Sequence, residues 1–157
     1  MDYQQIIRSQ YLATLEMLKF TIEKCPDSLW DDQADKNKFW HVAYHALFYT
    51  HLYLQPTEQD FKPWGEQHAP RQLSETADRP YSKEETLEYL AFCQQQVIDQ
   101  VPQLNLDAES GFYWLPMNKA ELQIYNIRHL QQHAGELMER LGSRAGLDVD
   151  WVGMKHD

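Results

Sequence analysis

Three histidines of this chain, His45, His129 and His133, have residue types and spacing that could bind a metal ion. His129 and His133 are four residues apart in YNIRHLQQHAGEL, a segment with helical patterning, so their rings project from one helix face. His45 lies far away in sequence, in the aromatic segment FWHVAYHALFYTHLYL. Three neutral imidazoles leave one coordination position open, which is typical of catalytic rather than structural zinc-type sites. The pattern therefore predicts a metal site with room for a further ligand.

The same histidines also have a purely structural interpretation. The chain contains seven histidines, so one pair four residues apart is no rarity, and an HxxxH spacing alone is weak evidence for a metal. His41 and His45 form a second such pair, so helix geometry alone leaves open which of them is the ligand. His51 is a further candidate. His68, in a loop, and His156, close to the end of the sequence, are expected to be solvated surface residues.

Other chemistries lack their sequence motifs. There is no HExxH of a zincin, no ExxH of a di-iron bundle, no GxGxxG, no phosphate-binding P-loop and no GxSxG. Cys25 and Cys93 are the only cysteines and do not form a CxxC pair. We expect both to be buried, inert thiols, and two isolated cysteines fit a reducing cytoplasm.

Size and charge limit the remaining classes of protein. A chain of 157 residues is long enough for one domain with a real core, and we expect a single domain over residues 1–157. The formal charge of −10 and scattered basic residues argue against direct contact with nucleic acid. No apolar run approaches the length of a membrane-spanning helix, and the first residues do not resemble a secretory signal. We expect a cytoplasmic protein that does not bind membranes.

The first half of the chain contains two predicted helices. In the first, apolar residues recur at helical spacing, at Tyr3, Ile7, Tyr11, Leu15, Leu18 and Ile22. This helix should end near Cys25, because Pro26 disfavours helical geometry in the residue before it. The second, roughly Lys38 to Leu54, is apolar nearly all the way round, which indicates a central helix of a bundle. The intervening DSLWDDQADKN is interpreted as a polar turn.

The second half of the chain contains two more predicted helices. One opens with a capping-box pattern at Ser82 and ends at Pro102, with an expected core stripe of Leu87, Leu90, Ala91, Gln94, Val97 and Ile98. The other begins around Asn118 and runs to about Leu141, where Gly142 would stop it. Its expected core stripe is Leu130, Ala134, Leu137 and Leu141.

The connections between these helices are unequal in length. Residues 55–81 contain four prolines and form an unusually long loop, which either covers a site or simply crosses over the bundle, with Phe61 and Trp64 packed down. Residues 103–116 contain the aromatic run GFYWLP, and Trp151 is expected to anchor the C-terminal tail. Four helices with two long connections and one short one predict an all-α four-helix bundle.

The aromatic run FWHVAYHALFYTHLYL, followed much later by AELQIYNIRHLQQHAGEL, resembles the DinB/YfiT-like superfamily. That resemblance implies a four-helix bundle with a three-histidine metal site, one ligand coming from the second helix and two from an HxxxH pair on the last. Carried onto this chain, the ligands are His45, His129 and His133. His41 is then a neighbouring histidine that belongs to the core or supports the ligands from behind, and His51 has no assigned role.

The resemblance implies less about activity, because this superfamily includes thiol-dependent S-transferases, a mycothiol-dependent isomerase and metal-dependent hydrolases. Our leading hypothesis is an enzyme that uses a divalent ion to activate water or a low-molecular-weight thiol against a small molecule. Zinc or nickel is expected first, with iron or manganese as alternatives. Glu136, one turn beyond His133, would orient a ligand or shuttle a proton, or else is a solvated helix residue. The alternative function is a non-catalytic stress-response or interaction module with a structural or incidental metal. A homodimer is expected in either case.

Overall fold

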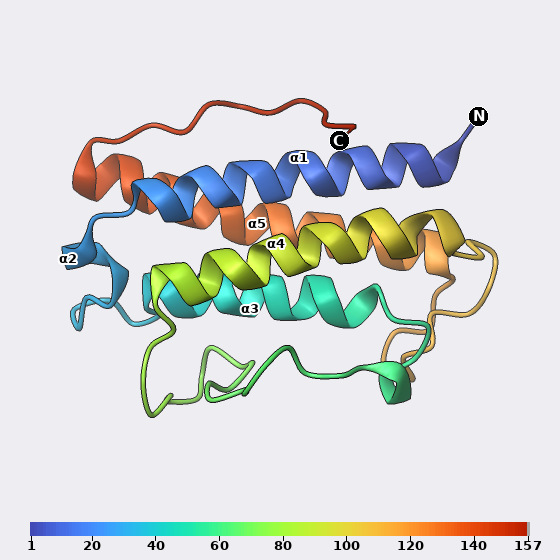
Figure 1. Cartoon of the computed structure of the whole chain (residues 1–157), viewed down its shortest axis with the longest axis horizontal. Coiled ribbons are helices and arrows are strands. Elements are labelled where there is room, and N and C mark those ends of the chain that lie inside the picture. Colours follow the sequence, from blue (N-terminus) through green and yellow to red (C-terminus); the bar gives the residue numbers. More distant parts are fainter. Residues whose placement is uncertain (157) are drawn as a thin grey trace.

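The computed structural model describes residues 1–156, and these form an all-α fold built on four long helices (Figure 1). No strand occurs among the described residues, so the predicted four-helix bundle with long connections is confirmed. The long helices are α1 (Tyr3–Lys24), α3 (Phe39–Tyr53), α4 (Lys83–Gln100) and α5 (Lys119–Ala145). The short elements are α2 (Asp27–Trp30) and two 3₁₀ turns, η1 (Glu58–Asp60) and η2 (Val101–Gln103).

The order of the helices in space explains why one connection is so long. Helix α3 packs against α4 and α5, and α1 packs against the same two helices from the other side. Figure 1 shows α3 and α4 running in the same direction. A chain that leaves the end of α3 must therefore return along the whole bundle before α4 can begin, and residues 55–81 make that return beneath α3.

The helix ends follow from capping chemistry that is visible in the sequence. Ser82 forms both halves of a capping box with Glu85, and the side chain of Asn118 accepts a hydrogen bond from the amide of Glu121. Helix α1 ends at the residue before Cys25, as Pro26 requires. These starts and stops, together with the bounds of α3, are confirmed.

Three expectations about the helices are wrong in detail. Helix α5 continues past Gly142 and ends at Ala145, where Gly146 takes the left-handed conformation with φ of +65°. The DSLW segment forms the helical turn α2 instead of a polar turn, because Leu29 and Trp30 are buried against the core. On α4 the buried stripe is Thr86, Tyr89, Leu90, Cys93 and Val97, and Ala91 faces solvent.

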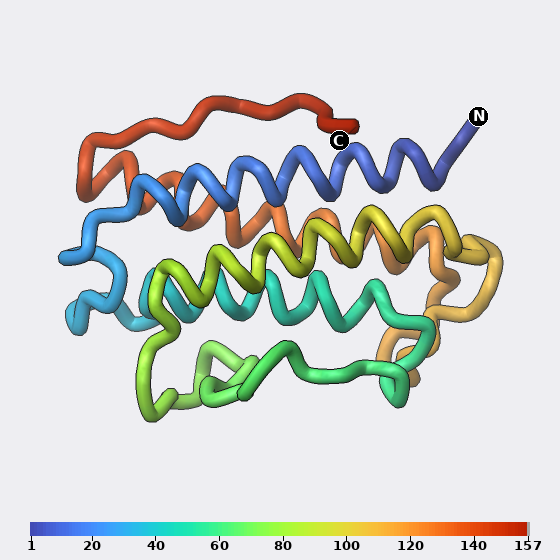
Figure 2. Tube along the Cα trace, in the orientation of Figure 1, coloured from blue at the N-terminus to red at the C-terminus, as the bar shows by residue number. Residues whose placement is uncertain are grey.

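Trp151 does not anchor the C-terminal tail, because its side chain is 73% exposed. The tail runs back along α1 (Figure 2). It is held there by polar contacts with that helix. Lys24 donates to the carbonyl of Asp148 at 2.6 Å, and Nζ of Lys155 lies 2.7 Å from a carboxylate oxygen of Glu16.

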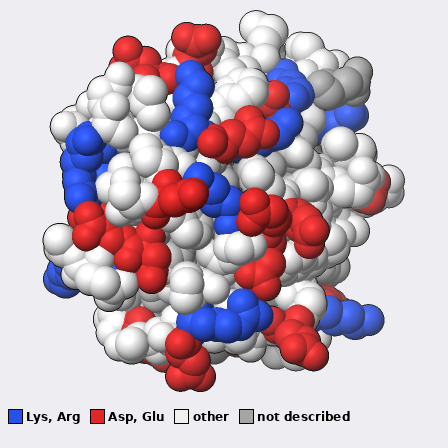
Figure 3. Space-filling model, turned by 60° about the vertical axis from the view of Figure 1, so that its left-hand side comes forward, with Lys and Arg blue, Asp and Glu red and all other residues white. Residues whose placement is uncertain are grey.

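The charges on one face and the composition of the helices within residues 1–156 give no sign of a nucleic-acid or membrane-spanning protein. On the face shown in Figure 3, Lys and Arg side chains are interspersed with carboxylates and form no continuous basic patch. None of the helices within residues 1–156 is both long and apolar enough to span a bilayer.

Candidate metal centre

Helices α3 and α5 bring the three predicted histidines together. His45 lies on α3, whereas His129 and His133 lie one turn apart on α5. The Nε2 atom of His129 is 3.1 Å from Nε2 of His45 and 3.2 Å from Nε2 of His133. One ligand atom from each ring can be chosen so that all three lie within 4.8 Å of one another. We call this group the histidine cluster.

The partners of the outer ring nitrogens fix the tautomers of two of these rings. Nδ1 of His45 lies 2.7 Å from the carbonyl oxygen of Arg71, and Nδ1 of His133 lies 3.0 Å from a carboxylate oxygen of Glu136. Both oxygens only accept hydrogen bonds, so each Nδ1 carries the proton. Each Nε2 then has a lone pair directed at His129, and His129 has only one Nε2 proton to offer to the two of them.

The histidine cluster therefore fits a cation. Two imidazole nitrogens bound tetrahedrally to zinc at about 2.0–2.1 Å would be about 3.3 Å apart. The observed separations of 3.1 and 3.2 Å are close to that value. Nδ1 of His129 is buried and has no hydrogen-bond partner in the described chain, so the protein itself does not fix the tautomer of this ring. A cation would resolve the excess of lone pairs by accepting all three.

Burial keeps two rings of the cluster, His45 and His129, neutral, as metal ligands must be. Desolvation lowers the pKa of His45 to about 4, although the hydrogen bond to the Arg71 carbonyl works in the opposite direction. Desolvation, reinforced by the neighbouring His133 and His45, lowers the pKa of His129 to about 3. Both rings are therefore unprotonated at neutral pH, and a cation would not have to displace their protons.

Glu136 lies behind the cluster, on the far side of His133. One carboxylate oxygen accepts the Nδ1 proton of His133, and the other lies 3.3 Å from the guanidinium of Arg140. This guanidinium also lies 3.3 Å from Asp35 and donates to the carbonyl of Asn37 at 2.7 Å. Of the tasks expected for Glu136, this geometry suits orientation of a ligand. Hydrogen bonds on the outer nitrogen of a metal-binding histidine commonly do this.

The remaining histidines lie outside the cluster. His41 points to the carbonyl oxygen of Pro70 at 2.8 Å and stacks on Trp40. His51 bonds the hydroxyl of Tyr89 at 3.1 Å within an aromatic pocket. The expectation of a solvated His68 is wrong, because its ring packs on Tyr81 with centroids 3.8 Å apart and both ring nitrogens are buried. His156 is exposed, as expected.

The two cysteines are buried and free, as predicted. Burial raises the pKa of Cys25 to about 12 and also raises that of Cys93. Neither thiol is a competent nucleophile in this fold.

The long loop of residues 55–81 contacts the histidine cluster and also packs on the bundle. Its carbonyls at Pro70 and Arg71 are the hydrogen-bond partners of His41 and His45. Its aromatic residues Phe61 and Trp64 pack on the core, and Trp64 stacks on Tyr89, so this part of the prediction is confirmed.

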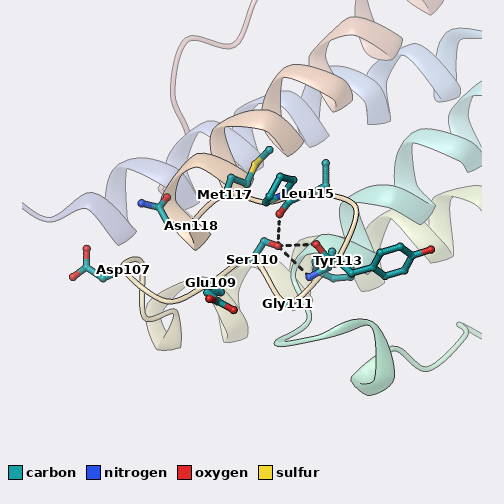
Figure 4. A pocket seen from close by; sticks show the side chains of 10 residues that line it. Asp107, Glu109, Ser110, Gly111, Tyr113, Leu115, Met117 and Asn118 are labelled. Carbon is teal, nitrogen blue, oxygen red and sulfur yellow. Dashed lines mark hydrogen bonds between the residues drawn. The ribbon is translucent and has the colours of Figure 1, made fainter.

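A more spacious surface hollow lies elsewhere. It has a volume of about 690 Å³ and is formed by the loop between α4 and α5, where Ser110 bonds the carbonyls of Phe112 and Leu115 (Figure 4). Its lining includes Asp107, Glu109 and Tyr113 but none of the histidines. The cluster instead borders two smaller hollows, one lined by His129 itself and one by Tyr49. The ring of Tyr49 contacts both His45 and His129.

Sequence analysis did not identify the groups that orient the histidines. Arg140 had a visible signal, because it follows Glu136 by four residues on one helix and can pair with it. The carbonyl of Arg71 had none, since every residue carries a carbonyl. Tyr49 follows His45 by four residues, but its aromatic neighbours in the sequence concealed it.

A helical bundle with three histidines facing one point defines a class of candidate metalloprotein. Comparison with protein families gives a match to the DinB superfamily over residues 10–137. The chain belongs to that superfamily. Neither a comparison with curated proteins nor one with solved structures gave a match.

Proposed function

We propose that this protein is a metal-dependent enzyme that holds a divalent cation on His45, His129 and His133 and acts on a small molecule. The observation that carries the proposal is the convergence of three ring nitrogens, two of them on rings whose Nδ1 atoms are already held by hydrogen-bond acceptors. Membership of the DinB superfamily is compatible with it. The reaction would be a thiol S-transfer or a hydrolysis.

A divalent cation at this position would lower the pKa of a water or thiol, and so supply a nucleophile at neutral pH. The protein's own residues have simpler tasks. Arg71 and Glu136 hold the rings of His45 and His133 through their Nδ1 atoms. Tyr49 packs edge-on to His45 and so limits how that ring can turn. We assign Glu136 a positioning role, because its carboxylate contacts His133 on the side away from the cluster.

The donor set narrows the choice of metal. Three imidazoles without a carboxylate favour zinc, nickel or copper over magnesium and manganese. We therefore propose zinc or nickel, with iron as the next candidate and manganese last.

The first experiment is elemental analysis of untagged protein, followed by titration with zinc and nickel. About one equivalent should bind to the wild type, and His45→Ala, His129→Ala and His133→Ala should each lose it. His41→Ala is the matched control, since it removes a buried histidine one turn from His45 that lies outside the cluster. Wild-type protein that binds neither metal would contradict the proposal.

The second experiment separates an enzyme from an interaction module. Metal-loaded protein would be incubated with small thiols and an alkyl halide, and separately with activated esters. Turnover that disappears in His133→Ala, with the fold retained, would establish catalysis. A protein whose stability depends on the metal but which turns over neither class of substrate would instead be a module with a structural ion.

We further propose that the protein works in the cytoplasm as a homodimer. The two isolated, buried cysteines suit a reducing compartment, and twofold dimers are the commonest oligomers. Sedimentation equilibrium of the metal-loaded chain would test the dimer, and a monomer at all concentrations would contradict it.

A further inference from the structure

A row of aromatic residues leads away from the histidine cluster along the contact of α3 with α5. Tyr49 comes one turn after His45 on α3, and its ring centroid lies 5.0 Å from that of His45 and 5.4 Å from that of His129. Tyr53 follows one turn later, 5.6 Å from Tyr49. The indole nitrogen of Trp114 lies 3.4 Å from the hydroxyl of Tyr53, so the loop before α5 extends the row.

This row forms one wall of a hollow of about 350 Å³, which we call the aromatic trough. Its lining comes from α3, from the long loop and from the loop before α5: Tyr49, Tyr53, Glu58, Arg71, Gln72, Tyr113 and Trp114. The volume suits a small molecule, and flat aromatic walls favour a ligand with an aromatic or similarly flat apolar body. Tyr113 is 89% exposed at the edge of the trough and is free to pack on such a body.

The polar groups of the trough include several hydrogen-bond donors without acceptors. The Tyr49 hydroxyl accepts from Gln72 at 2.9 Å and the Tyr53 hydroxyl accepts from Trp114, which leaves the proton of each hydroxyl to donate. No acceptor for either proton occurs in residues 1–156. The guanidinium of Arg71 lies 5.7 Å from the ring centroid of Phe48 and has no ion pair or hydrogen bond within the same residues.

The charges that line the trough determine which kind of anion these donors could bind. Arg71 is the only cationic residue lining the trough, and Glu58 adds a negative charge to the same lining. One guanidinium can balance a monoanion and bind a carboxylate with two parallel hydrogen bonds. Glu58 repels either anion, but it repels a dianionic phosphate about twice as strongly as a monoanionic carboxylate. The lining therefore favours a carboxylate over a phosphate.

We propose that the aromatic trough is a binding subsite for a small aromatic carboxylate, with Arg71 as the residue that recognises its carboxylate group. Arg71 is well placed for this task, because its own carbonyl is bound to His45 and so fixes the residue beside the cluster. The subsite's catalytic relevance rests on the proposed function, since the cluster would then act on the body of a substrate held here. Binding itself requires no metal.

The test uses the metal-free and the zinc-loaded full-length chain. Benzoate, phenylacetate and indole-3-acetate, each paired with its primary amide, would be titrated while the indole N–H signal of Trp114 is followed by NMR. At least one acid should shift that signal and bind about tenfold or more tightly than its neutral amide. Phenyl phosphate, the dianionic counterpart, should bind more weakly than the best acid.

Two arginine variants locate the contact. Arg71→Gln should weaken binding of the acid about tenfold and leave the amide unchanged, and Arg71→Lys should recover part of the loss. Arg128→Gln is the matched control, because Arg128 is also exposed, lies next to His129 and lines the neighbouring hollow. Its removal should change the affinity by less than about twofold, as expected for screened charge alone.

Several results would overturn the proposal: no shift with any acid, equal affinity for acids and amides, tighter binding of phenyl phosphate, or equal effects of Arg71→Gln and Arg128→Gln. A failure of the proposed function looks different. Protein that binds the acids through Arg71 but binds no zinc or nickel would retain the subsite and lose only the metal-dependent chemistry.

Discussion

Nδ1 of His133 donates to a carboxylate oxygen of Glu136 over 3.0 Å, and this contact begins a chain of polar contacts that reaches another part of the fold. The second oxygen of Glu136 pairs with Arg140, and Arg140 in turn contacts Asp35 and the carbonyl of Asn37. The segment before α3 is thus connected to a histidine of α5 through two successive side chains, those of Arg140 and Glu136. The orientation of one proposed ligand depends on residues far from it in sequence.

The Glu136 carboxylate should therefore control metal affinity without touching the metal. Glu136→Ala should lower zinc affinity about 10–100-fold, the usual effect of losing the hydrogen-bond partner of a ligand histidine. Glu136→Gln should cost less, since its amide oxygen still accepts the Nδ1 proton. Competition with a chelating indicator gives the affinities. Glu139→Ala, an exposed carboxylate on the same helix, is the control, and equal affinities of the two alanine variants would disprove the positioning role.

Arg140 should act on the same histidine one step further away. Arg140→Gln frees the Glu136 carboxylate, so zinc affinity should fall several-fold and the absorption spectrum of the cobalt-substituted protein should change. Arg144→Gln provides the comparison. Arg144 pairs with Asp32 at 2.5 Å and Asp35 at 2.6 Å but not with Glu136, and its side chain is 38% exposed. Its loss should cost little stability, because these ion pairs are exposed to solvent, and should leave the cobalt spectrum unchanged. Identical spectra for both variants would contradict this chain of contacts.

The histidine cluster shows how far sequence could lead. Helical spacing placed His129 and His133 on one face, and the family resemblance chose His45 over His41. Spacing could not make that second choice, because both residues are buried on α3 and the difference lies in which of them faces α5. That register is a property of the packed pair of helices. It is not contained in the pattern of either helix alone.

Helix ends and loops also separate into features that local sequence predicts and features that depend on the packed fold. The caps at Ser82 and Asn118 could be predicted because capping is local chemistry between residues three apart. The end of α5 could not, since Gly142 and Gly146 are both suitable stops and only Gly146 adopts the left-handed conformation. The support of His45 by a backbone carbonyl of the long loop also has no local signature.

A buried histidine outside the cluster predicts a pH dependence of stability. Burial lowers the pKa of His51 from 6.5 to about 4, so the folded protein holds this ring neutral. As the pH falls from about 6.5 towards 4, the unfolded chain gains a proton here that the folded chain does not, and stability falls by about 2–3 kcal/mol. Below that window both states are protonated and this loss stops.

The variant His51→Gln removes this titration while keeping a polar group within reach of Tyr89. Urea unfolding of metal-free protein between pH 7 and 4 should show a shallower loss of stability in the variant than in the wild type. The variant can be less stable at every pH, since the ring also packs on Phe61 and Phe92, and only the slope is diagnostic. Parallel curves for the two proteins would show that burial does not lower the pKa of His51.

Lys119 provides a prediction at the first turn of α5. Its buried ammonium group donates to three carbonyls, those of Gln55 at 2.9 Å, Pro56 at 2.7 Å and Ser110 at 2.5 Å. These acceptors belong to the start of the long loop and to the loop before α5, so one side chain ties both loops to the helix. Lys119→Met would leave the three carbonyls without their donor, and the free energy of unfolding should fall by about 3–5 kcal/mol.

Urea unfolding of Lys119→Met beside Lys62→Met, which changes an exposed lysine of the long loop, isolates the buried contacts. The two loops tied by Lys119 also supply Glu58, Tyr113 and Trp114 to the aromatic trough. Lys119→Met should therefore weaken binding of an aromatic carboxylate as well as stability. Zinc affinity should change little, because the three histidines and Glu136 keep their places on α3 and α5. Equal stability of the two variants would mean that the carbonyls find other donors, and the ammonium group would then have no structural role.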